Sequence, residues 1–218
     1  MPTCIIQILW HVPSAVRRRI NAATLLKGLD VPSVAVYRLL LCLRETGSWD
    51  LAYDMLMELG WITSRSTLCG DRYTPSLQQR ATVSGYMDAD GSTLTEKALN
   101  VIDADRLVAS QGSNAGGEEH KRLMRLTIEM IQKRGNFAFV PSAKDSFDVG
   151  ELESAGSRWS ARVKIYEAQT NAKPGELEKC IARSARLATN ITSLTIVTDS
   201  EKVKARVGED FKLKCILL

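Results

Sequence analysis

FDVGEL at residues 147–152 and VKIYEAQ at residues 163–169 are the two segments that decide the fold of this chain. The second segment alternates in the manner of a β-strand, so Val163, Ile165 and Glu167 are expected on one face. That face begins with apolar side chains and ends in a carboxylate. An isolated ionised carboxylate is very costly to bury, so Glu167 is expected to be paired or to bind a cation.

Asp148, on the preceding strand, is the obvious second oxygen donor. Two carboxylates on neighbouring strands, opening at one edge of a sheet, form a hard-oxygen site of the kind that Mg²⁺ accepts. The alternative is that both are ordinary strand-end carboxylates paired with arginines such as Arg158 or Arg162.

The pattern of Asp148 followed by Glu167-x-Gln169 resembles the PD-(D/E)XK nuclease superfamily, which includes type II restriction enzymes and Holliday-junction resolvases. A helical pattern stands ahead of it, at residues 118–134, and another behind it, at 174–188. The resemblance covers about residues 118–207 and implies an α/β fold with a restriction-endonuclease-like mixed sheet flanked by helices. Phe147 replaces the usual proline.

Gln169 stands where the superfamily usually has lysine, although some active restriction enzymes carry glutamine there. The resemblance implies that Asp148, Glu167 and Gln169 are catalytic, and that Mg²⁺ is held by Asp148, Glu167 and the carbonyl of Ala168. Gln169 would orient the attacking water or contact the phosphate. A leading helix often contributes an acidic residue, and Glu119 and Glu129 are the candidates. The cations expected to contact DNA or to supply the missing positive charge are Lys144, Lys164, Lys173, Lys179 and Arg183.

The N-terminal half, residues 1–109, is predicted to be a mostly helical, winged-helix-like domain. Helices are expected at 14–29, 34–45, 49–59 and 96–107, and short strands at 61–63 and 92–95. The third helix carries Asp50, Asp54 and Glu58 on one face, so it is a poor reader of DNA. The module either binds DNA through the wing, with Arg65, Arg72 and Arg80, or serves packing or dimerisation.

Residues 110–117 are rich in Gly, Ser and Asn, which predicts a linker before a second domain at residues 118–218. The first 117 residues carry 11 basic and 11 acidic side chains, whereas the remainder carries 18 basic and 14 acidic ones. The basic excess therefore lies in the half with the carboxylate pair, as expected for a protein that binds a polyanion such as DNA.

Five scattered cysteines, with no C-x-x-C pair, support neither a zinc site nor a disulfide framework. The sequence shows no membrane-spanning run and no signal peptide, so a cytoplasmic protein is expected. Three function classes follow. The first is a Mg²⁺-dependent DNA endonuclease, expected to be a homodimer because two-strand cutting needs two sites. The second is a winged-helix DNA-binding protein with an inactive nuclease-like domain, and the third is a protein-interaction subunit.

Overall fold

The computed structural model describes residues 4–9, 26, 28–63, 75–111, 116–141, 147–171, 173, 175–176, 178–179, 191–211 and 215–217. The helices with bounds in this part are α2 (Val34–Thr46), α3 (Trp49–Glu58), α5 (Leu77–Val83), α6 (Glu96–Ile102), α7 (Ala104–Ala109), α8 (Glu118–Lys133) and α10 (Glu201–Phe211). The strands are β1 (Cys4–Leu9), β2 (Phe137–Phe139), β3 (Val149–Ala155), β4 (Arg158–Ala168), β5 (Ile191–Thr198) and β6 (Cys215–Leu217). The predicted mixed α/β class is confirmed.

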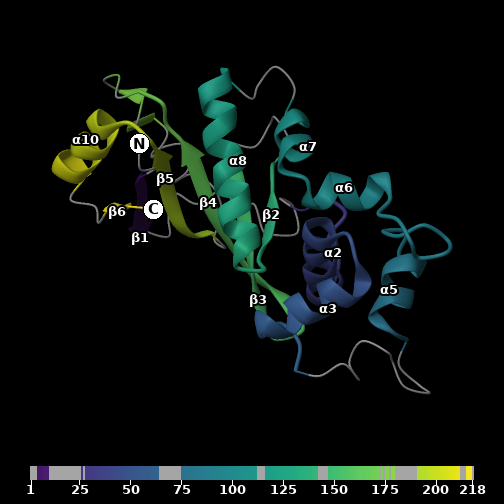
Figure 1. Ribbon diagram of the computed structural model, residues 1–218. Coiled ribbons are helices and arrows are strands. Elements are labelled where there is room, and N and C mark those ends of the chain that lie inside the picture. Colours follow the sequence, from purple (N-terminus) through teal and green to yellow (C-terminus); the bar gives the residue numbers. More distant parts are fainter. Residues whose placement is uncertain are drawn as a thin grey trace.

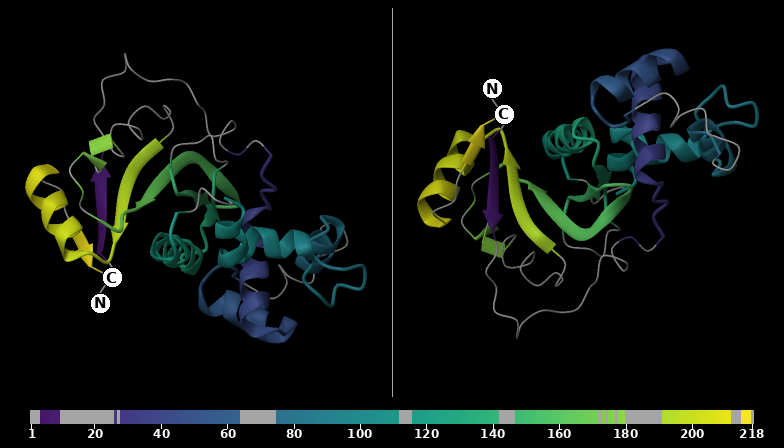
Figure 2. Two further views of the ribbon diagram at one scale, coloured as in Figure 1. Left: turned by 90° about the horizontal axis from the view of Figure 1, so that it is seen from above. Right: turned by 90° about the horizontal axis from the view of Figure 1, so that it is seen from below.

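A six-stranded sheet in the order β2-β3-β4-β5-β1-β6 forms the centre of the molecule (Figure 1). Neighbouring strands are antiparallel except β4 and β5, which are parallel. The start of β3 and the ends of β4 and β5 therefore lie at the same edge of the sheet. Figure 2 shows how strongly this sheet twists from β1 and β6 to β3.

The two faces of the sheet are covered by different helices. Helix α8 buries Leu123, Met124, Ile128 and Ile131 in a cluster with Val149, Tyr166, Ala168 and Val197 of the strands. The other face buries Val163, Ile165, Leu194 and Ile196 together with residues of α2 and α10. Residues that alternate along β4 thus enter two separate cores, as the strand periodicity requires.

The helical N-terminal part is packed directly against the sheet. The ring of Tyr37 in α2 contacts Phe137 and Trp159, with ring centroids 5.2 and 5.6 Å apart. The Trp159 indole donates a 2.7 Å hydrogen bond to the carbonyl of Pro32. Strand β1, which precedes this helical part in the chain, pairs with β5 and β6. The sheet therefore takes strands from both sides of the expected boundary at 110–117.

Helix α2 has capping residues at both ends. The Ser33 hydroxyl accepts from the amide of Val36, and Gly47 ends α2 in the left-handed region, with φ of 63°. The strand predicted at 61–63 is wrong. The amides of Trp61 and Ile62 both donate hydrogen bonds to the carbonyl of Leu56 near the end of α3, so they do not pair with another strand.

The strand predicted at 92–95 is also wrong, and only an isolated bridge joins Met87 to Leu94 there. The Asp88 carboxylate accepts from the amides of Ser92 and Thr93, which closes the segment into a turn. Ahead of this turn is α5, a helix not predicted from the sequence. It begins with a reciprocal capping box of Ser76 and Gln79.

The helix predicted at 96–107 is two helices, because Asp103 breaks it. Asp103 has extended backbone angles, and its side chain accepts a 3.1 Å hydrogen bond from the amide of Arg106, which caps α7. The helix predicted at 14–29 lies almost wholly outside the described residues, as do Arg65 and Arg72. None of the helices in the described ranges has the length and apolarity to cross a bilayer.

Candidate active site at the edge of the sheet

One edge of the sheet gathers the polar residues singled out in the sequence. The start of β3, the end of β4 and the end of β5 meet there. The N-terminal turn of α8 lies at the same edge, because a side chain from that turn contacts the residue before β3. The predicted residues Asp148, Ala168 and Gln169 all lie at this edge, and so does His120, which was not predicted.

Asp148 is fixed by the strand beside it. Its amide donates to the carbonyl of Tyr166 at 3.2 Å, and its Oδ2 accepts from the amide of Ala168 at 2.7 Å. The side chain therefore replaces a backbone acceptor in the β3–β4 ladder. Because 18% of the Asp148 side chain is exposed, the carboxylate can be reached from solvent.

His120 is a side-chain partner of Asp148 in the described structure. It lies in the first turn of α8, and its Nε2 is 3.3 Å from Asp148 Oδ1. The hydrogen bond to Asp148 raises the pKa of His120; burial of the imidazole opposes this effect, and the charge of Asp148 and the backbone of Ala168 add to it. His120 could have been suspected as one of only two histidines in the chain, placed directly after the glycine-rich linker.

Gly116 makes room for this histidine. Its φ is 69°, and a Cβ at this position would lie 3.1 Å from the imidazole ring of His120. A side chain at residue 116 would therefore be strained in its backbone and crowded against the ring. The linker glycine has a structural role beside the candidate site.

Glu167, the second predicted ligand, is almost completely buried, with 1% exposed. By strand alternation it shares the face of Val163 and Ile165, whereas its neighbours Tyr166 and Ala168 enter the core under α8. Asp148 reaches toward α8 to contact His120. The structure thus brings Asp148 to His120, while Glu167 is buried on the adjacent strand.

Gln169 continues the pairing of β4 with β5, because its amide donates to the carbonyl of Val197 at 2.9 Å. Its side chain is half-buried and, by the same alternation, follows Glu167. Lys164 is occupied elsewhere, in a 2.7 Å ion pair with Glu153. The missing lysine charge is therefore not supplied from this position of β4.

An ion-pair network lies beside the pair of Asp148 and His120. Arg122 lies two residues after His120 on α8. It forms a 2.6 Å ion pair with Glu119 and a second ion pair with Asp199, the residue after β5. Glu119, one of the two acidic candidates on the leading helix, is thus at this edge. Glu129, the other, is three turns further along α8 and lines a different cavity. Because carboxylates outnumber the cations here, the edge favours a positively charged ligand.

The donor chemistry at this edge fits a divalent cation in part. Within the described ranges, no three His, Cys, Asp or Glu side chains lie close enough together to hold a metal ion by themselves. Asp148 and His120 offer one carboxylate and one imidazole, next to the backbone of Ala168. Mg²⁺ and Mn²⁺ accept such sparse sets because they retain several waters.

The predicted DNA contacts lie in part beyond the described residues, since Lys144 and Arg183 are outside them. Lys173 and Lys179 are described and exposed, and both follow β4 in the chain. They are available for contact with a polyanion that approaches from the loop after β4.

Comparison of the chain with protein-family models, with curated proteins and with solved structures found no match.

Proposed function

We propose that this protein is a divalent-cation-dependent DNA endonuclease of the PD-(D/E)XK type, with its site at the sheet edge of Asp148 and His120. One observation carries the proposal: Asp148 at the start of β3 contacts both the leading helix, through His120, and the end of β4, through the amide of Ala168. In the superfamily that the sequence resembles, a leading helix packs next to two adjacent strands that each carry a carboxylate residue.

The chain order supports the same proposal. Helix α8 is followed by the antiparallel strands β2, β3 and β4, then by helical residues at 176 and 178–179, and then by β5 parallel to β4. A leading helix, three strands, a helix and a strand are the order expected of a restriction-endonuclease-like sheet. The proposed fold is therefore compatible with every described element from 118 to 211.

The residues of the chain would divide the work of phosphodiester hydrolysis. Asp148 and His120 would hold the cation in place of the hydrogen bond between them, with the Ala168 carbonyl as a further donor. When bound, the cation would lower the pKa of a coordinated water and neutralise charge on the phosphate. The Gln169 amide would orient substrate, and Lys173 and Lys179 would hold the DNA backbone.

The burial of Glu167 favours a second candidate, a DNA-binding protein whose nuclease-like domain is inactive. Only 1% of Glu167 is exposed, and Gln169 cannot supply a positive charge where lysine usually does. Such a protein would bind DNA at the same surface without cutting it. The two candidates share a partner and differ in their chemistry.

Incubation of the protein with supercoiled plasmid and with a branched DNA, in Mg²⁺ or Mn²⁺ and then in EDTA, separates the two candidates. The endonuclease cuts one of these substrates only with the cation. Asp148→Asn is the informative variant, because the asparagine oxygen can still accept from the Ala168 amide while the charge is lost. Cleavage is expected to stop while the fold remains.

Glu153→Gln is the matched control on the same strand, because Glu153 is half-exposed and pairs with Lys164 away from the site. It should cut as the parent protein does. Full cleavage by Asp148→Asn would exclude the proposed site, and binding of both DNAs without any cleavage would favour the inactive candidate.

The DNA surface has its own test. If Lys173 and Lys179 each contact a phosphate, replacing both with alanine should lower the slope of log K against log salt by about 2. Lys202→Ala on α10 is the control, because its exposed side chain lies on another element. A homodimer, proposed because two strands must be cut, is tested by light scattering with and without DNA.

A further inference from the structure

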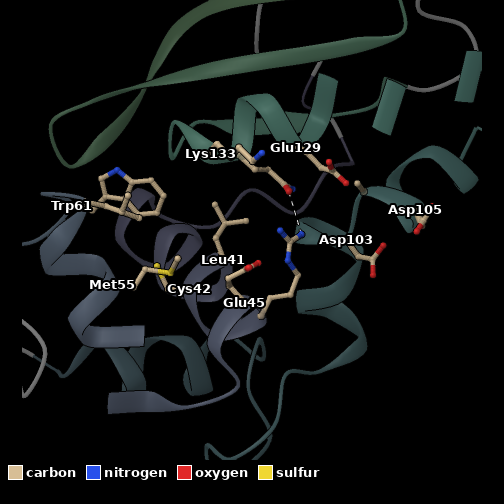
Figure 3. Close-up of a pocket in the computed structure, with 13 residues that line it drawn as sticks. Leu41, Cys42, Glu45, Met55, Trp61, Asp103, Asp105, Glu129 and Lys133 are labelled. Carbon is tan, nitrogen blue, oxygen red and sulfur yellow. Dashed lines mark hydrogen bonds between the residues drawn. The ribbon is translucent and has the colours of Figure 1, made fainter. Parts of the chain in front are cut away.

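A cavity of about 530 Å³ lies between the N-terminal helices and α8, away from the sheet edge (Figure 3). Its walls come from α2, α3, α7 and α8 and from the segment after α3. Pockets that enclose small organic ligands have volumes of about 300–1,000 Å³. The size of this cavity is therefore sufficient for a ring system with a short side chain.

One part of the cavity is apolar. Leu41, Met55, Leu59 and Trp61 form it, and Figure 3 shows Trp61 and Met55 together on one side with Leu41 next to them. The Trp61 ring already makes a cation–π contact with the Arg38 guanidinium, which lies 5.2 Å from the ring centroid. Such a wall favours a flat apolar body over a strongly hydrated ligand.

The other part is acidic. Glu45, Asp103, Asp105 and Glu129 line it, with Asp103 and Asp105 on the side away from Trp61 in Figure 3. Asp105 is paired with Arg125 at 2.5 Å, and Asp103 caps α7. Glu45 and Glu129 are exposed and have no hydrogen bond or ion pair with any described residue. Two carboxylates therefore remain available for a ligand.

The basic residues of the cavity do not cancel this charge. Arg44 directs its guanidinium to the carbonyl of Ile102 and to Gln132 Oε1, the latter at 3.2 Å, so it is used in joining α2 to α8. Lys133, the other cation, stands one helical turn from Glu129 on α8. The cavity keeps an excess of negative charge beside an apolar wall.

We propose that this cavity is a binding site for a small organic cation with a flat apolar body, such as an aromatic amine. The ring would lie against Leu41, Met55 and Trp61, and the ammonium group would face Glu45 and Glu129. The site is independent of the proposed nuclease chemistry, because none of its residues belongs to the edge of Asp148 and His120.

The test uses three probes that share an indole ring and differ in charge: tryptamine, the neutral alcohol tryptophol, and the anion indole-3-propionate. Titration calorimetry with the full-length protein should give a Kd for tryptamine of about 1 mM or below, as expected for a ligand of this size. Tryptophol should bind more weakly and indole-3-propionate weakest. Tryptamine binding should also weaken as salt is raised.

Variants locate the site. Glu45→Gln and Glu129→Gln should each weaken tryptamine binding by about two- to five-fold, whereas Glu58→Gln, an exposed acidic residue of α3 outside the cavity, should not. Leu59→Trp should fill the cavity and weaken binding at least ten-fold. Met57→Trp is its control, since Met57 and Leu59 are similarly exposed, at 42% and 44%, and only Leu59 lines the cavity.

Three results would overturn the proposal. The first is the absence of tryptamine binding at millimolar concentration, and the second is equal binding of tryptamine and tryptophol. The third is equal loss of binding in Leu59→Trp and Met57→Trp. If Leu59→Trp fails to fold, the two glutamine variants and Glu58→Gln still decide the question, because those changes are nearly isosteric and exposed.

Discussion

Glu151 is the most deeply buried carboxylate in the described part of the chain, and its removal offers the sharpest test of the packing under α8. Its side chain is 0% exposed and accepts hydrogen bonds from Asn136 Nδ2 at 2.6 Å, from Arg134 at 3.0 Å and from the Tyr166 hydroxyl. Burial, together with the charge of Glu151, raises the pKa of Tyr166. The carboxylate thus joins β3 to β4, to the end of α8 and to the segment before β2.

Glu151→Ala would leave the Tyr166 hydroxyl and the Asn136 amide without their acceptor and would open a void. Each unsatisfied buried polar group costs about 1–3 kcal/mol. Arg134 loses less, because 46% of its side chain is exposed and water can solvate it. The free energy of unfolding should therefore fall by about 2–5 kcal/mol.

Glu153→Ala is the matched control, from the same strand. Glu153 is 47% exposed and its ion pair with Lys164 is screened, so its loss should cost about 0–1 kcal/mol. Urea unfolding followed by circular dichroism should place the Glu151→Ala midpoint about 1–2 M below that of the control, given a slope of about 2–3 kcal/mol/M. Midpoints that agree within experimental error would refute the structural role assigned to Glu151.

Two further changes test the cores. Gly150→Ala should destabilise the protein by about 1–3 kcal/mol, because a Cβ would lie 2.2 Å from the buried ring of Phe139. Gly117→Ala is the control and should cost little, because its Cβ would meet no atom within 4 Å. Equal thermal stabilities of the two variants would contradict this packing. Burial raises the pKa of Tyr37 to about 12, so the stability that its neutral form contributes is present below pH 10 and is lost as pH rises through 12. Tyr37→Phe should therefore lose less stability than the parent between pH 8 and pH 11, and an identical loss in chemical-denaturation curves would contradict the assignment.

Local signals predicted much of the fold. The alternation at 163–169 and the helical patterns at 34–45, 49–59 and 118–134 all predicted elements close to those found. These signals act over a few residues, through backbone hydrogen bonds and side-chain periodicity. The class of the fold follows from them.

Long-range pairing was beyond such signals. Nothing in the composition of β1 indicates that it pairs with β5 and β6, which lie nearly two hundred residues away in the chain. The break at Asp103 was, in contrast, readable in principle, because aspartate is a strong N-cap residue, but the apolar pattern on both sides concealed it.

Only part of the candidate site was predicted, because its geometry also depends on contacts between distant parts of the chain. Asp148 and Glu167 were expected to converge because they belong to neighbouring strands. The contacts of Asp148 with the Ala168 amide and with His120, however, join separate elements, and strand periodicity does not predict them. His120 was missed because its role depends on where α8 crosses the sheet.

Titration of the protein with Mn²⁺, followed by calorimetry or by the paramagnetic signal of the free ion, tests the central claim most directly. The parent chain should bind the cation with about one site per chain, and Asp148→Asn and His120→Ala should each weaken that binding at least ten-fold, while Glu153→Gln leaves it unchanged. Equal Mn²⁺ affinity in the parent and in Asp148→Asn would contradict a cation site at this edge of the sheet.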